Sequence, residues 1–282
     1  MSETVRAVVV DANAPGRLSI QPVALAPAAA TDVTVRVTAI SLNRGEVKRA
    51  VTASDPGARP GWDFVGIVEE AAKQGGGPPV GARVVGLLLS GAWAERVRVP
   101  SHAVAVLPEG VSDAQAATLP VAGLTALHAL RQGGLLLGQK VLIDGTSGGV
   151  GHLAIQLAAA SGAIVCGHVR RPELCASVER WCNGGVAVGP SLESARPLGP
   201  FHLILDSVGG QTLASALTML ANTGTCVTFG VSEAPTSTFE SGSFFRIGGV
   251  RLYGLIIFEE LARVERRVSA SRCWRISSSV RS

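Results

Sequence analysis

The sequence of 282 residues predicts an α/β protein with a β-rich domain followed by a doubly wound parallel-sheet domain. Two observations support this fold class. Residues 5–110 consist of short β-rich segments separated by Gly and Pro turns, which is typical of an all-β region. From residue 140 onward, apolar strand segments alternate with helical segments, which is the pattern of a parallel sheet. The chain is also longer than one typical domain and can bury a large core.

The β-rich domain is expected to begin the chain and to end near residue 118. Its expected strands are residues 5–10, 33–40, 61–69, 82–89 and 96–99. Helical signals begin at Ser112, a candidate N-cap, and continue through residues 126–131. We therefore expect one domain at residues 1–118, a second at 119–258, and an atypical C-terminal segment at 259–282.

A glycine-rich turn lies inside the most informative stretch, residues 140–171. An apolar strand at 141–143 runs into this turn, an amphipathic helix follows, and a second strand spans 163–169. The glycines of the turn are Gly145, Gly148, Gly149 and Gly151. Glycine allows backbone torsions closed to other residues and lets a pyrophosphate approach the main chain. The helix start offers free N–H groups to that anion. The order predicts the first βαβ unit of a dinucleotide-binding fold rather than a merely structural turn.

The end of the second strand carries no acidic residue. In NAD-binding units, a carboxylate about twenty positions after the glycines binds the adenosine ribose. Here the strand ends at Arg170 and Arg171, and the first carboxylate is Glu173. The planar arginine fork pairs well with a phosphate, which favours NADPH over NADH. The other interpretation is that the two arginines form a solvated strand end.

Further elements complete the second domain. The expected strands are residues 186–188, 201–206, 226–229 and 252–257, with a helix at 211–220 between two of them. No apolar run approaches the length of a membrane span, and the N-terminus shows no signal-peptide pattern. We therefore expect a cytoplasmic protein.

Cysteine and charge patterns exclude several function classes. Five cysteines without CxxC spacing indicate neither a disulfide framework nor a zinc ribbon. The five histidines are scattered, and each is interpreted as a surface or core residue. The net charge is +4, but six arginines and one glutamate fall within residues 263–282, so the basic balance belongs to that tail. Nucleic-acid binding gains little support.

The motifs together resemble the medium-chain dehydrogenase/reductase superfamily, specifically its zinc-free quinone oxidoreductase (zeta-crystallin-like) branch. The matching segments include SLNRGE at 41–46, PGWDFVGIVEE at 60–70, GAWAERVRVP at 91–100, GTSGGVG at 145–151 and LILDSVGG at 203–210. They occur in the family's order between about residue 5 and about residue 262. The resemblance implies a GroES-like substrate domain, a Rossmann domain, and nicotinamide in the cleft between them. We also expect a homodimer.

The resemblance implies a set of cofactor-binding positions. In many relatives a lysine holds the 2′-phosphate, but its position holds Leu174, so that role would fall to the two arginines. The expected cofactor-binding residues are Thr125, Ser147, Gly148, Gly149, Val150, Arg170, Arg171, Ser207, Phe229, Gly230 and Val231.

The same resemblance places Asn43, Trp62 and Val121 at the positions that hold catalytic zinc in the alcohol-dehydrogenase branch. Indole and valine offer no lone pair, so we expect no metal. Without a Lewis acid, alcohol oxidation lacks a stabilised alkoxide, whereas a quinone or enone takes the charge onto its own oxygen. Asn43 is the candidate catalytic residue near the acceptor oxygen, and its alternative is a turn asparagine. No residue is assigned as the acid that protonates the product.

Three functions fit these residues. The first is an NADPH-dependent quinone or enone reductase, and the second is an enoyl thioester reductase of the same superfamily. The third is a non-catalytic NADPH-binding protein. The sequence does not name the substrate, because pocket shape depends on variable loops.

The resemblance ends after residue 262, where the sequence continues as RVERRVSASRCWRISSSVRS. This run lacks strand alternation and a sustained apolar helical face. We expect a truncated or frameshifted end that is poorly ordered from about residue 264 and is cut first by trypsin. The alternative is a divergent tail.

Overall fold

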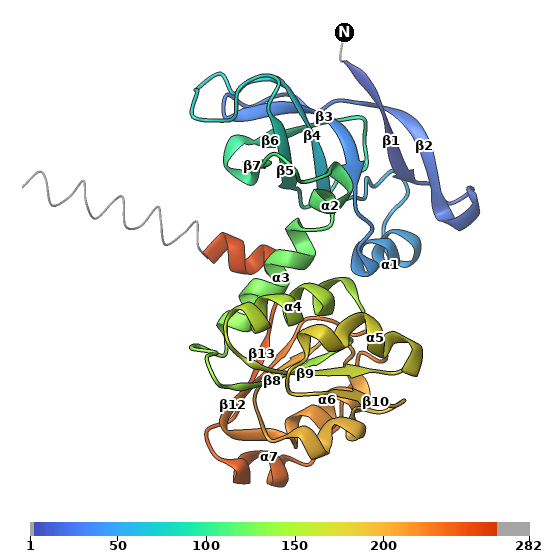
Figure 1. The fold of residues 1–282 in the computed structure, drawn as a ribbon. Helices are drawn as coiled ribbons and strands as arrows, with labels where there is room; N and C mark the ends of the chain where they lie inside the picture. The colour runs from blue at the N-terminus through green and yellow to red at the C-terminus, as the bar shows by residue number, and fades with distance from the viewer. Residues whose placement is uncertain (1–2, 264–282) are drawn as a thin grey trace, which may run out of the picture. The chain divides into compact units, whose positions relative to one another are not determined.

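The computed structural model describes residues 3–263, and the chain divides into two compact units after Ala122 (Figure 1). The expectation about residues 264–282 lies outside the described residues. The division falls within the sequence of α3, Pro120–Arg131. No helix in the described part of the chain is long and apolar enough to cross a membrane.

The first unit is built from antiparallel strands. A two-stranded ribbon pairs β1 (Thr4–Val10) with β2 (Leu18–Ala24). A five-stranded sheet has the order β6-β3-β4-β5-β7. Its strands are β3 (Asp32–Ile40), β4 (Asp63–Glu70), β5 (Arg83–Leu87), β6 (Arg96–Pro100) and β7 (Val104–Val106). Its buried core includes Val33, Phe64 and Val99. Buried and half-buried residues alternate along β6, whereas β3 and β4 contain runs of buried residues. The prediction of a β-rich first region is confirmed.

Two short α-helices accompany these strands. Helix α1 (Arg44–Thr52) was not predicted, because its sequence RGEVKRAVT is mostly polar and exposes little periodicity. Helix α2 (Asp113–Ala117) was predicted from Ser112, which is its N-cap and accepts from the backbone N–H of Gln115 at 3.3 Å. The 3-10 turns Pro15–Arg17 and Ser101–Ala103 complete this unit.

The second unit is a six-stranded parallel sheet with the order β10-β9-β8-β11-β12-β13. The strands are β8 (Lys140–Asp144), β9 (Ile164–Val169), β10 (Val186–Val188), β11 (Phe201–Asp206), β12 (Leu220–Thr228) and β13 (Arg251–Gly254). The chain builds outward from β8 to β10, then returns to the other side of β8. This order is that of a Rossmann fold, with its switch point between β8 and β11. The predicted doubly wound domain is confirmed.

Helices cover both faces of this sheet (Figure 1). On one face, Val141 and Ile143 of β8 pack with α3 and α4 (Gly149–Ala160). On the other face, Leu142 packs with α6 (Gly210–Leu217) and the 3-10 segment Leu192–Leu198. Because both faces are buried, the central strands are apolar runs rather than alternating ones. The remaining helices are α5 (Cys175–Val178) and α7 (Ser241–Ile247), with 3-10 turns at Pro172–Leu174 and Glu179–Trp181.

Several element boundaries differ from the sequence prediction, among them the start of the strand predicted for 226–229, which begins at Leu220. The helix predicted to reach residue 220 ends at Leu217, and Leu220 already begins β12. The apolar pattern continues through this junction without a glycine or proline, so the sequence carries no stop signal there. The strand predicted for 252–257 ends at Gly254, and residues 257–263 are helical. Helix α7 was not predicted.

Candidate functional site

The glycine-rich turn lies at the switch point of the parallel sheet. Strand β8 ends at Asp144, Gly145 turns the chain with φ of 68°, and Gly148 is the N-cap of α4. The Gly148 N–H donates to the Gly145 carbonyl oxygen at 2.9 Å. At Gly151, an added Cβ would lie 2.2 Å from that same oxygen. Gly151 is therefore required by the packing of the helix against the turn.

Gly149 is not required by the protein's own packing. A Cβ added there would meet no atom within 4 Å, and its φ is not positive. Ser147, Gly148 and Gly149 are all exposed at the start of the 12-residue helix α4. A bare backbone at a helix N-terminus leaves room for an external anion and offers it free N–H groups. The turn therefore fits the pyrophosphate of a dinucleotide.

The loops after β11 and β12 meet this turn. A Cβ added at Gly145 would lie 3.2 Å from Ser207 Oγ, and one at Gly230 would lie 2.6 Å from the Ser207 carbonyl oxygen. Phe229, the residue before Gly230, donates its N–H to the Asp206 carbonyl oxygen at 3.0 Å. The structure thus brings together four expected site regions at the carboxyl edge of three strands: the glycine turn, Ser207, Phe229 and Gly230.

Asp206 was not singled out in the sequence, although it organises these loops. Its Oδ1 accepts from the backbone N–H groups of Val208 and Gly209 at 3.1 and 3.2 Å. Its Oδ2 accepts from Thr228 Oγ1 at 2.9 Å. The side chain is fully buried, and this burial raises the pKa of Asp206. Asp206 therefore joins the end of β11 to the end of β12.

The two arginines directly follow β9, and both are exposed. Arg171 Nε lies 3.5 Å from Glu173 Oε1, a surface ion pair that leaves its fork accessible. No described ion pair involves Arg170. Both guanidinium groups are available to a phosphate, which would find no carboxylate on the strand end itself.

The other expected cofactor residues are placed as follows. Thr125 lies on α3 and is buried, Val150 lies in the first turn of α4 and is half-buried, and Val231 follows Gly230 and is 50% exposed. Among the described hydrogen bonds, none joins Thr125 to the glycine turn.

Asn43 is the N-terminal cap residue of α1, and its amide is held by two carboxyl groups. Its Nδ2 lies 2.7 Å from Asp63 Oδ2, 2.9 Å from Glu46 Oε1 and 3.1 Å from Ser41 Oγ. An amide nitrogen has two hydrogens, so these internal acceptors use its donor capacity. The contacts give Asn43 a role in ordering this cluster, and a direct contact with an acceptor molecule stays a prediction.

Asp63 and Glu46 form the buried acidic part of this cluster. Asp63 Oδ1 accepts from the Val121 N–H at 3.0 Å, and Oδ2 accepts from Ser41 Oγ at 2.5 Å. Glu46 Oε1 accepts from the Asn43 N–H at 2.7 Å, whereas Glu46 Oε2 is buried without a hydrogen-bond partner. Burial raises the pKa of both carboxyl groups. One signal was available in the sequence: Asp63 is an acidic residue directly before the apolar run at 64–68.

Asp63 links the three positions at which the alcohol-dehydrogenase branch holds zinc. It contacts Asn43 and Val121 directly, and it follows Trp62 in the chain. An indole and an isopropyl group donate no lone pair to a metal, and the Asn43 amide is engaged by carboxyl groups. Within residues 3–263, no group of three His, Cys, Asp or Glu side chains could hold a metal ion.

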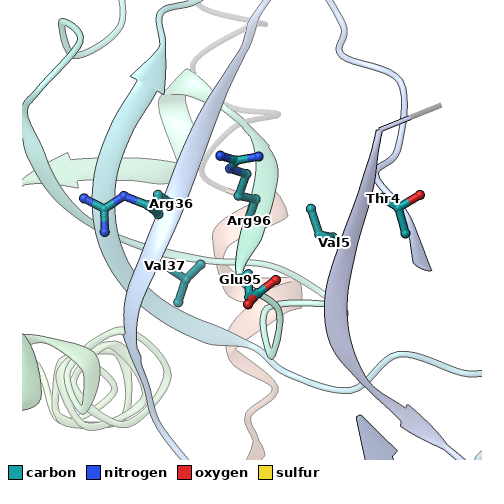
Figure 2. Close-up of a pocket in the computed structure, with 6 residues that line it drawn as sticks. All are labelled: Thr4, Val5, Arg36, Val37, Glu95 and Arg96. Carbon is teal, nitrogen blue, oxygen red and sulfur yellow. The ribbon is translucent and has the colours of Figure 1, made fainter. Parts of the chain in front are cut away.

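The first unit also has a cavity of about 380 Å³ that involves none of these residues. Thr4 and Val5 line it from β1, and Arg36, Val37, Glu95 and Arg96 line it from the other side (Figure 2). Its arginines are already paired: Arg96 Nε lies 2.7 Å and Arg36 Nε 3.2 Å from the Glu69 carboxylate. We therefore assign it no ligand.

Comparisons with known proteins agree with this arrangement. Residues 29–109 match the alcohol dehydrogenase GroES-like domain family, and residues 149–270 match the zinc-binding dehydrogenase family. Acryloyl-coenzyme A reductase from Sulfurisphaera tokodaii is 29% identical, with 60% of this chain and 59% of that protein covered. The 2-methylene-furan-3-one reductase from Solanum lycopersicum is 31% identical, with 63% and 50% covered. The matches thus span 59% and 50% of the length of these two curated relatives.

A solved structure extends the likeness to nearly the whole chain. The quinone oxidoreductase from Coxiella burnetii superposes with a TM-score of 0.77 at 26% identity. The match covers 95% of this chain and 89% of that one.

Proposed function

Because the chain belongs to the medium-chain dehydrogenase/reductase superfamily, we propose that it is a metal-independent reductase of quinones or α,β-unsaturated carbonyls that uses NADPH. The observation that carries this proposal is Gly149, an exposed glycine at a helix start that the protein's own packing does not require. NADPH, when bound, supplies the hydride. The first turn of α4 would hold the pyrophosphate, and Ser207, Phe229 and Gly230 would line the nicotinamide end.

The choice of NADPH over NADH rests on the end of β9. Arg170 and Arg171 are exposed where an acidic ribose ligand would otherwise stand. Two guanidinium forks favour a 2′-phosphate, because each can donate two parallel hydrogen bonds to its oxygens.

The choice of acceptor rests on the positions that lack metal ligands. Trp62 and Val121 cannot hold a Lewis acid, and Asn43 faces Asp63 and Glu46. A substrate reduced here must therefore accept the incoming charge on its own oxygen, as a quinone or an enone does. Oxidation of a simple alcohol is not expected here, because the alkoxide that develops in that reaction needs an external group to stabilise its charge.

An enoyl thioester reductase is the second candidate, and it is favoured by one observation. Acryloyl-coenzyme A reductase is among the relatives, and a thioester-conjugated alkene accepts hydride by the same electron flow. A non-catalytic NADPH-binding protein is the third candidate. The three candidate functions are distinguished by which acceptor, if any, oxidises bound NADPH.

One experiment tests the proposal. NADPH and NADH are titrated by fluorescence, and cofactor oxidation is then followed with quinones, enones, short enoyl-CoA thioesters and a no-acceptor control. We expect tighter NADPH binding and turnover with a quinone or enone, unchanged by chelator and without stoichiometric zinc by elemental analysis. Turnover with thioesters alone would select the second candidate, and binding without any turnover the third. Ethanol oxidation with NADP⁺, or about one zinc per chain, would contradict the proposal.

A further inference from the structure

Asp144 and His168 form a buried pair directly behind the glycine-rich turn. Asp144 is the last residue of β8, and it lies opposite His168 in the register of the parallel strands β8 and β9. Both residues are at most 3% exposed. His168 Nδ1 lies 2.6 Å from Asp144 Oδ1, and its Nε2 lies 3.0 Å from the Gly189 carbonyl oxygen. The ring is therefore held between two acceptors.

These two contacts fix how many protons the pair holds. A carbonyl oxygen only accepts, so Nε2 carries a hydrogen. An ionised carboxylate also only accepts, so the contact between Nδ1 and Oδ1 requires a second proton on one of the two groups. The pair thus holds one proton more than a neutral imidazole beside an ionised carboxylate. Without that proton, two lone pairs would face each other across 2.6 Å.

His168 is also the point at which the turn is attached to β9. Thr146, a fully buried residue of the turn, donates to the His168 carbonyl oxygen through its N–H at 3.3 Å and through Oγ1 at 2.9 Å. Gly189 donates its N–H to the Val169 oxygen at 3.1 Å. The turn, the end of β9 and the segment after β10 therefore all meet at His168. Arg170 is the second residue beyond it.

The side chains that neighbour Asp144 across the sheet are an acid and a thiol. Asp144 Oδ2 is buried without a hydrogen-bond partner, so a full negative charge there would have little stabilisation. The neighbouring strands present Asp206 on β11 and Cys226 on β12. Burial is the main cause that raises the pKa of each, and the charge of Asp144 adds to it. Neither neighbour supplies a positive charge that would replace the proton.

We propose that Asp144 and His168 act as a one-proton clamp that holds the glycine-rich turn in the conformation that binds the cofactor. His168 is a positioning residue in this scheme, because it acts through Thr146 rather than by touching the cofactor. When the contact between Nδ1 and Oδ1 is removed, the ring loses one of its two anchors, and the end of β9 to which Thr146 is bonded is held less firmly. The effect of the clamp on NADPH binding rests on the proposed function, whereas the presence of the shared proton between Asp144 and His168 is independent of it.

The Asp144→Asn variant separates the proton from the structure. An asparagine Nδ2 donates to His168 Nδ1, which keeps the contact without an ionisable group at position 144. Asp144→Leu removes the contact. His202→Ala, which changes an exposed histidine on β11, is the matched control. The readouts are NADPH affinity by fluorescence at pH 7 and the proton NMR spectrum of the unliganded protein.

We expect Asp144→Leu to lower NADPH affinity at least about tenfold, which corresponds to roughly 1.4 kcal/mol. Asp144→Asn and the control should stay within about twofold of the wild type, because both keep the contact to His168. A strongly downfield hydrogen-bonded proton should appear in the wild type and disappear in Asp144→Asn. Equal affinity in wild type and Asp144→Leu, or no downfield proton in the wild type, would overturn the clamp.

The two proposals fail differently. Absence of NADPH binding in the wild type would overturn the proposed function and the clamp's role in binding. A downfield proton that depends on Asp144 in such a protein would still support the shared proton.

Discussion

Gly149 and Gly151 lie two residues apart in one helix and meet different requirements. Gly151 is fixed by the Gly145 oxygen inside the protein, whereas the space beside Gly149 opens to the outside. Gly151→Ala should lower the free energy of unfolding by about 1–3 kcal/mol or more, because its methyl overlaps a backbone oxygen. Gly149→Ala should leave stability unchanged or slightly raised, since alanine favours helix, and should weaken NADPH binding at least about tenfold.

Urea unfolding and fluorescence titration of both variants check this pair. Unchanged NADPH affinity in a folded Gly149→Ala protein would show that no phosphate approaches that backbone.

Arg170 and Arg171 should determine the preference between the two nicotinamide cofactors. A charge-assisted contact contributes about 1.5–3 kcal/mol, so changing both residues to alanine should cost roughly ten- to over a hundredfold in NADPH affinity. NADH affinity should change little, because NADH has no 2′-phosphate. Arg180→Ala, an exposed arginine stacked on Trp181, is the control. Equal wild-type affinities for NADPH and NADH would refute this role.

Glu46 should make the protein less stable as the pH rises. Burial raises its pKa above the ordinary value of 4.5, so the folded state binds this proton more tightly than the unfolded state does. The stabilisation from that proton is fully present at low pH and is lost as pH rises from 4.5 through the folded value. Asp63 adds a loss of the same sign that starts from its ordinary value of 3.8.

Glu46→Gln removes one of these two contributions. The gap in unfolding free energy between variant and wild type should therefore move in favour of the variant between pH 4 and pH 7, as measured by urea unfolding. Glu109→Gln, at an exposed site, should show no such trend. A gap that moves the other way would mean that Glu46 is stabilised as a carboxylate.

At the level of elements, β13 is one of the two edge strands of the parallel sheet as far as the described residues extend, and β10 is the other. It pairs with β12 on one side, and Leu252 is 43% exposed. An exposed edge is a template for pairing with another strand, so we predict a homodimer in which β13 meets its counterpart. Leu252→Lys should shift the mass measured by light scattering from dimer toward monomer, and Leu89→Lys, in a loop of the first unit, should not. A dimeric Leu252→Lys protein would place the interface elsewhere.

The elements that the sequence predicted are those with a clear burial pattern. Strands β8, β9 and β11 are buried on both faces and are therefore continuous apolar runs bounded by turns. Strand β2 was missed because it is only half-buried and contains Pro22, and α1 because its polar residues conceal its period. No glycine or proline marks the end of α6 at Leu217. The position of this end is set by the pairing of β12 in the sheet rather than by the local sequence.

Site residues could be predicted from the sequence where a single continuous segment both contains them and positions them. The glycine turn and the arginines after β9 are contiguous with the strands that position them. Asp206, and the pairing of Asp144 with His168, depend on which strands are neighbours and in which register. That information belongs to the folded sheet, so no local pattern could show it.

At the level of the whole molecule, the expected cofactor site draws on segments that are far apart in the sequence. Hydrogen exchange measured with and without NADPH should therefore show joint protection of residues 145–150, 206–209 and 228–231, because the turn and the two loops meet at one sheet edge. Saturating ligand at 100 times the Kd should add about 2.7 kcal/mol to the stability of the folded state. Protection confined to one of the three segments would contradict a shared site.

The strand register at Asp144 and His168 also has a consequence for how this protein can change over generations. Most replacements of one residue alone leave a buried polar group of the other without a partner, with asparagine at position 144 as the exception, so the two positions are expected to be inherited and exchanged as a couple. A laboratory evolution library that randomises position 168 alone would recover mostly histidine, and one that randomises position 144 alone would recover mostly aspartate and asparagine. A library that randomises both would find the alternative pairs that the sheet accepts.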